Sequence, residues 1–256
     1  MEWISPDLTV ELLLIASAVA VFAGLIKGIV GFAMPTIFVA GLGFFVDPQL
    51  ALAGLILPTL VTNGYQALRQ GRRAAVQSIK KFRVFLISGG VFLLCSAQLV
   101  TVLDDRILLM MIGVPVTGFA IIQLFGLQLF PPTSRSSGSE ATVGAFAGFL
   151  GGFSGIWGPP TVAYLTALNT EKRDQIRIQG VIYGLGALAL FFAHLLSGVL
   201  RQDTIWFSAI LIVPGMLGMW LGTQVQDKID QRRFQKLTLV VLVFAGLNLL
   251  RKALLG

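Results

Sequence analysis

Apolar residues run along most of this chain and are interrupted by short polar stretches. The uninterrupted runs reach about 20 residues, the length that a helix needs to cross the hydrocarbon core of a bilayer. A transmembrane β-barrel would show shorter segments in which apolar and polar residues alternate. The pattern therefore predicts an all-α polytopic membrane protein. Full spans are expected at residues 49–68, 84–103, 107–130, 176–200, 204–224 and 236–255.

Two further apolar segments, residues 8–46 and 141–168, contain clusters of Gly and Pro. Each segment is long for one crossing and short for two at about 1.5 Å per residue, which favours a helical hairpin whose arms meet at the cluster. The two clusters are similar in sequence. FAGLIKGIVGFAMPT at residues 22–36 recurs as FAGFLGGFSGIWGPPT at residues 146–161.

This recurrence predicts two inverted-topology repeats, each an interrupted helical hairpin followed by three transmembrane helices. The first repeat would cover residues 1–130 and the second residues 141–256, joined by the polar linker 131–140. Paired interrupted segments in two halves of a membrane protein are the sequence indication of a transporter's central binding site.

Composition agrees with a membrane protein. The chain of 256 residues is 55% hydrophobic and 12% charged, and its mean hydropathy is +0.84. Soluble domains carry about twice that share of charged residues. The amino terminus has Glu2, Asp7 and Glu11 but no Lys or Arg, so we expect the first span to be retained rather than cleaved as a signal peptide. A single cysteine, Cys95, predicts no disulfide, metal site or cofactor.

The formal net charge of +7 comes mainly from a few short loops. Lys and Arg gather at residues 69–83, 131–140, 171–177 and 224–236. The positive-inside rule places these loops in the cytoplasm and both termini in the periplasm. Because the rule accounts for the charge, no nucleic-acid partner is predicted. The predicted partners are a small anion and the lipid bilayer, and the pattern carries no prediction of oligomeric state.

The broken helices indicate the sign of the ligand. A helix that restarts inside the bilayer leaves free backbone N–H groups, and its positive end favours an anion. Lys27 lies in the first cluster among apolar residues, where an ammonium is costly unless it has a partner or a watery cavity. Snorkelling of Lys27 from a shallow turn remains the alternative.

Further polar residues are candidates for the same site. Thr59, Asn63 and Gln66 share one helix face, although such side chains also form hydrogen bonds between helices. Arg177 is either a ligand or a cytoplasmic anchor. The candidate substrate-binding residues are Lys27, Gly28, Gly31, Pro35, Thr36, Thr59, Asn63, Gln66, Ser154, Gly155, Trp157, Pro160, Thr161, Arg177, Gln179 and Tyr183. His194 is a candidate for coupling, with an interfacial hydrogen bond as its alternative role.

The twice-repeated Gly-rich segment followed by Pro, in halves that each carry three further spans, resembles the sulfite exporter TauE/SafE family of membrane permeases. The family's Gly-rich turns match residues 24–35 and 148–160. The resemblance covers nearly the whole chain. It implies transport of sulfite, of organosulfonates such as sulfoacetate, or of related small sulfur-containing anions, commonly outward across the bacterial inner membrane.

Two other functions fit parts of the pattern. A passive anion channel would share the positive helix ends but not the alternating exposure that an inverted repeat provides. Ser154 within Gly152–Gly155 and His194 on the next span resemble the serine and base of a rhomboid-like intramembrane protease. Because the duplicated turn already explains that motif, we expect a secondary transporter with no catalytic residues.

Overall fold

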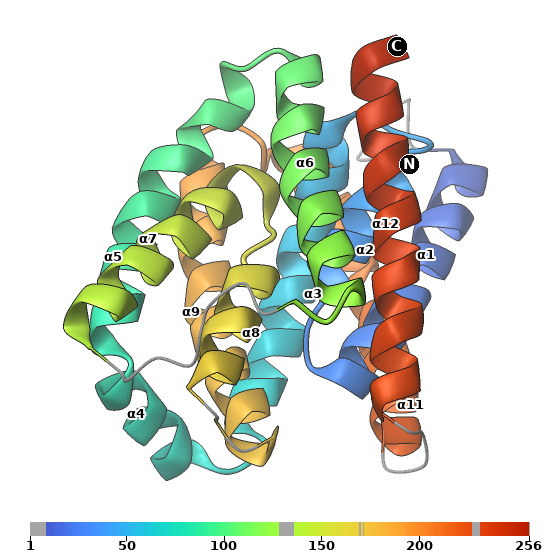
Figure 1. Ribbon diagram of the computed structural model, residues 1–256. Coiled ribbons are helices and arrows are strands. Elements are labelled where there is room, and N and C mark those ends of the chain that lie inside the picture. The colour runs from blue at the N-terminus through green and yellow to red at the C-terminus, as the bar shows by residue number, and fades with distance from the viewer. Residues whose placement is uncertain (1–8, 128–135, 169, 171, 227–230, 256) are drawn as a thin grey trace.

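The computed structural model describes residues 9–127, 136–168, 170, 172–226 and 231–255. Within these ranges the regular structure is entirely helical (Figure 1). The first interrupted segment forms α1 (Val10–Val30) and α2 (Met34–Leu42), and the second forms α7 (Ser137–Ser154) and α8 (Gly158–Ala167). The other elements are α3 (Pro48–Leu68), α4 (Arg72–Lys81), α5 (Arg83–Ala97), the 3-10 turn η1 (Gln98–Thr101), α6 (Asp105–Leu124), α9 (Lys172–Leu196), α10 (Gln202–Ile210), α11 (Ile212–Gln226) and α12 (Gln231–Leu255).

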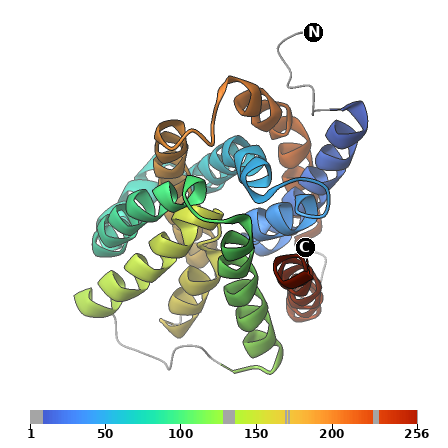
Figure 2. The ribbon, with the colours of Figure 1, turned by 90° about the horizontal axis from the view of Figure 1, so that it is seen from above.

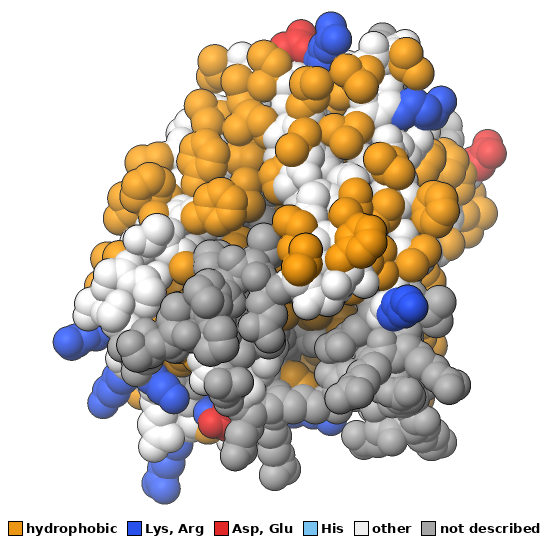
Figure 3. Space-filling model, in the orientation of Figure 1, with side chains coloured by type: hydrophobic (Ala, Val, Ile, Leu, Met, Phe, Trp, Pro, Cys, Tyr) orange, Lys and Arg blue, Asp and Glu red, His pale blue; other side chains and the backbone are white. Residues whose placement is uncertain are grey.

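Several of these helices are long and apolar enough to cross a membrane. In the described part of the chain there are five, at Val10–Val30, Arg83–Thr101, Arg106–Leu124, Asp174–Leu196 and Gln202–Val225. Hydrophobic side chains cover much of the visible face, and Lys and Arg gather toward the lower end (Figure 3). The expected class, an all-α polytopic membrane protein, is confirmed.

The helices pack in pairs that combine the two halves of the chain. α1 packs on α11 and α5 on α7, and these pairs lie on opposite sides of the bundle in Figure 2. α3 packs on α9 in the interior, and α6 packs on α12. Each hairpin therefore packs against a helix from the other half of the chain.

Glycines allow the two hairpin helices to approach their partners closely. A Cβ on Gly24 of α1 would lie 2.2 Å from Gly215 O of α11. A Cβ on Gly148 of α7 would lie 2.0 Å from Gly89 O of α5. Small residues at such contacts allow close van der Waals packing between the helices. In a bilayer this packing holds helices together, because lipid tails are as apolar as the helix surfaces and no hydrophobic driving force acts between helices.

Both hairpin turns begin with a left-handed glycine. Gly31, with φ 82°, caps the carboxyl end of α1, and Gly155, with φ 69°, caps that of α7. In each turn this glycine's N–H bonds the carbonyl four residues earlier, Lys27 O or Gly151 O. Only glycine adopts this conformation without steric cost, so the sequence identifies where each helix stops.

Three details differ from the sequence expectations. The segment expected as a loop at 69–83 contains α4, whose Ala75 and Ser78 are buried in a helix that contacts α9. The expected span 204–224 corresponds to the apolar crossing Gln202–Val225, but this crossing has a break at Leu211 between α10 and α11, because Pro214 has no N–H for the carbonyl of Ile210. α7 begins at Ser137, inside the expected linker, with a Ser136 capping box. The amino-terminal residues 1–8 and linker residues 131–135 lie outside the described part of the chain.

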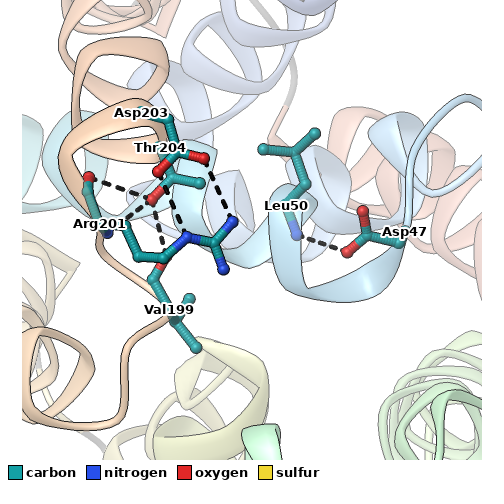
Figure 4. A network of polar contacts seen from close by, with 6 residues as sticks. All are labelled: Asp47, Leu50, Val199, Arg201, Asp203 and Thr204. Carbon is teal, nitrogen blue, oxygen red and sulfur yellow. Dashed lines mark hydrogen bonds and ion pairs between the residues drawn. The ribbon is translucent and has the colours of Figure 1, made fainter. Parts of the chain in front are cut away.

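Loops from the two halves meet at the end of the bundle opposite α4. Asp47 caps α3 by accepting a hydrogen bond from Leu50 N at 2.8 Å (Figure 4). Arg201, before α10, pairs with Asp203, with Arg201 Nη2 to Asp203 Oδ2 at 3.2 Å. This hydrogen bond, together with the negative charge of Asp203, raises the pKa of the Arg201 guanidinium.

Candidate functional site: a cavity between the two hairpin turns

A small cavity lies between the two hairpin turns and the central pair of helices, α3 and α9. Its volume of about 10 Å³, measured for the centre of a water-sized sphere, is room for about one water molecule. This space is smaller than a four-atom oxyanion needs. Its lining residues are Lys27, Phe32, Ala33, Pro35, Thr36, Asn63, Ile156, Trp157, Gly158 and Tyr183.

Lys27 is the charged group of this cavity. Its side chain is 1% exposed, so the ammonium does not snorkel to the surface of the protein. The structure gives Lys27 Nζ a hydrogen bond to Asn63 Oδ1, and no ion pair with a carboxylate of the described residues. A buried lysine that has only a neutral partner lacks a counter-ion, and an anion beside it would supply one.

Asn63 links the lysine to the central helix pair. Its Nδ2 donates to Tyr183 O of α9 at 3.2 Å, so its Oδ1 faces Lys27 on α1. This arrangement joins α1, α3 and α9 in one buried chain of polar contacts. It fixes the amide orientation, because the nitrogen must face the Tyr183 carbonyl.

The amino-terminal end of α2 borders the same cavity. α2 begins at Met34, has Pro35 in its first turn, and follows Ala33 with φ 74°. No side chain caps this end of the helix. Uncapped backbone N–H groups and the helix dipole make such an end favourable for an anion. Thr36 adds a hydroxyl group in the first turn.

The second turn contributes an aromatic wall instead of a charge. If Ser154 is aligned with Val30, the counterpart of Lys27 is Gly151. A Cβ on Gly151 would lie 2.4 Å from Cε3 of Trp157, so the indole packs over the position that lacks a side chain. Trp157 also faces Tyr183, whose Oη donates to Gly158 O at 3.2 Å. The two turns thus differ in chemistry despite their similar sequences.

Two buried glutamines pack around the first turn. Gln66 Nε2 donates to Gly31 O at 3.0 Å and to Ile176 O at 2.9 Å. Gln179 Oε1 would lie 3.0 Å from a Cβ on Gly31. Both Oε1 atoms, and Thr59 Oγ1, are buried and have no hydrogen-bond partner in the described residues. These three side chains lie outside the cavity lining.

Other candidates have local structural contacts. Ser154 Oγ accepts from Ile156 N at 3.1 Å, and Thr161 Oγ1 donates to Trp157 O at 2.8 Å. Pro160 is buried in α8. Gly28 lies in the α1–α11 contact, where a Cβ would be 2.3 Å from Met219 O. Gly31 and Gly155 form the turns themselves.

Arg177 lies in a different polar cluster. Its Nη1 donates to Gln70 Oε1 at 2.7 Å and pairs with Asp174 at 3.0 Å, and its Nε donates to Ser78 Oγ at 3.1 Å. These contacts join the end of α3, α4 and the start of α9. The structure therefore does not bring Arg177 to the cavity.

His194 contacts the tip of the second hairpin rather than the cavity. Its Nε2 lies 3.1 Å from Gly152 O and its Nδ1 lies 3.0 Å from Ser197 Oγ. Ser154 Oγ instead donates to Leu150 O. The serine and histidine that suggested a protease are thus engaged with other partners.

The sequence reasoning missed four lining residues, Phe32, Ala33, Ile156 and Gly158. All of them follow the turn glycines Gly31 and Gly155 and precede or begin the next helix. The sequence did indicate these four residues, because they lie between two helix ends. A turn inside the membrane lines the same space as the helix ends that it connects. Within the described residues, no group of three or more His, Cys, Asp or Glu gathers to hold a metal ion.

Apolar membrane-crossing helices and a buried lysine between two interrupted hairpins are typical of a membrane transporter. A comparison with known protein families identifies which family of transporters this is. The model of the sulfite exporter TauE/SafE family matches residues 16–249, so the chain belongs to this family of membrane transporters and not to an enzyme family. Comparisons with curated proteins and with solved structures gave no match.

Proposed function

We propose that the protein is a secondary carrier that exports a small sulfur-containing anion, such as sulfite or an organosulfonate like sulfoacetate. The observation that carries the proposal is the buried Lys27, which has an amide but no described carboxylate as its partner and borders the uncapped end of α2. An oxyanion would accept hydrogen bonds from the ammonium, from amides of the turns and from Thr36. Charge-assisted hydrogen bonds of this kind are the stronger ones in proteins.

The small volume of the cavity supports a carrier over a continuous pore. A space of about 10 Å³ must enlarge before a sulfite ion enters it. Transport would then require the cavity to open in turn toward each side of the membrane. Movement of the two hairpins relative to the α3–α9 pair is the change that we propose.

The helix pairing supports an inverted repeat as the basis of that movement. α1 contacts α11 as α7 contacts α5, and α3 contacts α9. Such reciprocal pairs arise when two similar units interlock, and rocking of one unit against the other exposes a central site alternately. In this proposal Lys27 and Trp157 lie on the two moving hairpins and meet at the substrate.

We further propose that the protein lies in the bacterial inner membrane with both termini in the periplasm. The exposed basic residues of α4 support this orientation through the positive-inside rule. His194, which connects α9 to the tip of α7, is proposed to couple proton binding to movement of this hairpin.

The test is sulfite counterflow in proteoliposomes. Vesicles loaded with unlabelled sulfite should accumulate external radiolabelled sulfite transiently and with saturation, because a carrier exchanges its substrate across the membrane. Lys27→Ala should lose this accumulation, and the exposed Lys236→Ala should retain it. Sulfoacetate and sulfate, added as competitors, would define which anion the cavity selects.

A channel gives a different result in the same vesicles. It would dissipate the sulfite gradient without transient accumulation of label, and its flux would not saturate at low concentrations. That outcome would overturn the carrier mechanism while leaving the anion site intact. Absence of both flux and counterflow for all sulfur anions would overturn the proposed substrate class.

A further inference from the structure

A second and larger cavity opens on the lipid-facing side of the bundle between α5, α7, α8 and α9. Its volume is about 420 Å³, and nearly all of its lining is apolar. The side chains of Ile87 and Leu185 are exposed at its outer side, whereas Leu93 and Trp157 are buried at its inner side. This apolar groove therefore extends from the lipid-facing surface into the protein.

One end of the apolar groove adjoins a basic segment of the chain. Ile79 at the end of α4 and Arg83 at the start of α5 belong to its lining. The segment 69–83 has six Lys or Arg residues and no Asp or Glu, and the charged residues are Arg69, Arg72, Arg73, Lys80, Lys81 and Arg83, all exposed. Figure 3 shows blue side chains at the lower left, where Figure 1 draws α4.

α4 has the composition of a helix that lies in the membrane interface. Ala75 and Ser78 face the protein, while Val76 and Ile79 are exposed apolar residues between exposed basic ones. Basic amphipathic helices of this kind bind anionic lipid surfaces. The positive charge of α4 thus attracts anionic lipids, and the acyl chains of such a lipid would fill the adjacent apolar groove.

We propose that the groove is a binding site for an anionic phospholipid. One acyl chain lies in the groove along Leu93, Leu185 and Gly90, and the phosphate group contacts Arg83 and the basic residues of α4. A neutral lipid would satisfy the apolar lining but not the positive end. The combination of an apolar groove and an unbalanced positive charge selects an anionic lipid over a zwitterionic one.

The site also touches the transport machinery. Trp157 and Thr161 line the groove, and Trp157 lines the small cavity between the turns as well. A bound acyl chain therefore packs against the outer side of Trp157, whose inner side forms a wall of the small cavity. Lipid occupancy holds Trp157 in place against the small cavity.

Fluorescence quenching of Trp157 by brominated lipids tests the proposal. Trp3→Phe, Trp206→Phe and Trp220→Phe together leave Trp157 as the single tryptophan. In phosphatidylcholine nanodiscs, phosphatidylglycerol with brominated acyl chains should quench Trp157 at lower mole fractions than brominated phosphatidylcholine, and with saturation. Arg83→Gln combined with Lys80→Gln should remove this preference for the anionic lipid.

A variant whose side chain fills the groove provides a second test of the lipid site. A Cβ on Gly90 meets no atom within 4 Å, so Gly90→Leu places its side chain in the groove without a backbone clash. This variant should lose the saturable quenching. Gly118→Leu on α6, where a Cβ is equally free, should retain it. Equal quenching by both lipids, or full quenching in Gly90→Leu, would overturn the proposal. This result is independent of sulfite transport.

Discussion

Lys27 on α1 donates a hydrogen bond to Asn63 on α3, and the same amide donates to the backbone of α9. This contact places a cation from the first hairpin against the central helix pair without neutralising its charge. A carboxylate in place of the amide would make a fixed ion pair. In the proposed mechanism, the neutrality of residue 63 leaves the lysine available to the transported anion.

Asn63→Asp should weaken anion binding while preserving the fold. The new carboxylate would pair with Lys27 and would compete with any anion for the ammonium. We expect sulfite affinity to fall by about tenfold or more, from the loss of one charge-assisted hydrogen bond. Isothermal titration calorimetry of the purified variant would measure the change.

Asn248→Asp is the matched control, because it makes the same chemical change on α12 outside the cavity lining. It should bind sulfite as the unmodified protein does. Unchanged affinity in Asn63→Asp would show that Lys27 does not contact the anion.

Gly148→Ala should destabilise the protein through the α5–α7 contact. The added Cβ would lie 2.0 Å from Gly89 O, and backbone atoms cannot move away as a flexible side chain does. Overpacking of this kind costs about 1–3 kcal/mol of folding free energy. Thermal unfolding followed by size-exclusion chromatography should show a lower midpoint for Gly148→Ala than for Gly90→Ala, whose Cβ has open space. Equal midpoints would mean that the two helices separate without cost.

The backbone of the first turn predicts that Gly31 and Ala33 differ in their tolerance of substitution. Gly31→Ala should lower stability by about 1 kcal/mol or more, since φ is 82° and the new Cβ would lie 3.0 Å from Gln179 Oε1. Ala33→Gly should change stability by less than about 1 kcal/mol, because relief of strain at φ 74° offsets the added flexibility of glycine. Thermal midpoints of both variants in detergent would test this contrast. A strongly destabilised Ala33→Gly would contradict it.

Arg177→Ala should affect stability more than substrate affinity. The guanidinium joins the segment after α3, α4 and the start of α9 through Gln70, Ser78 and Asp174, and Arg177 is not among the residues that line the cavity. We expect a lower unfolding temperature and a sulfite dissociation constant within about twofold of the original, since only the structural contacts are lost. A large loss of affinity at unchanged stability would instead make Arg177 a ligand.

Much of the architecture could be predicted from the sequence because the bilayer imposes simple rules. Apolar length predicts the crossing helices, and Gly31 and Gly155 mark where α1 and α7 end. The helix α4 escaped prediction because its apolar residues are few and its basic residues suggested only a loop. Its burial against α9 is a tertiary contact that no local pattern reveals.

The candidate site was only partly predictable for a related reason. Thr59, Asn63 and Gln66 share a helix face, but successive turns of a helix are about 5 Å apart along its axis. Only Asn63 lies at the depth of the cavity, while Gln66 reaches the end of α1. Periodicity predicts which face points inward, but the depth at which a hairpin turns is decided by packing between distant segments.

The most direct test of the account is equilibrium binding of sulfite to the purified protein and to Lys27→Ala, with sulfoacetate, taurine, sulfate and chloride as competitors. The account predicts saturable binding of sulfite or a sulfonate that falls by about tenfold or more without the ammonium, with the folded state retained. Unchanged affinity in folded Lys27→Ala would contradict the central claim that this buried lysine holds the transported anion.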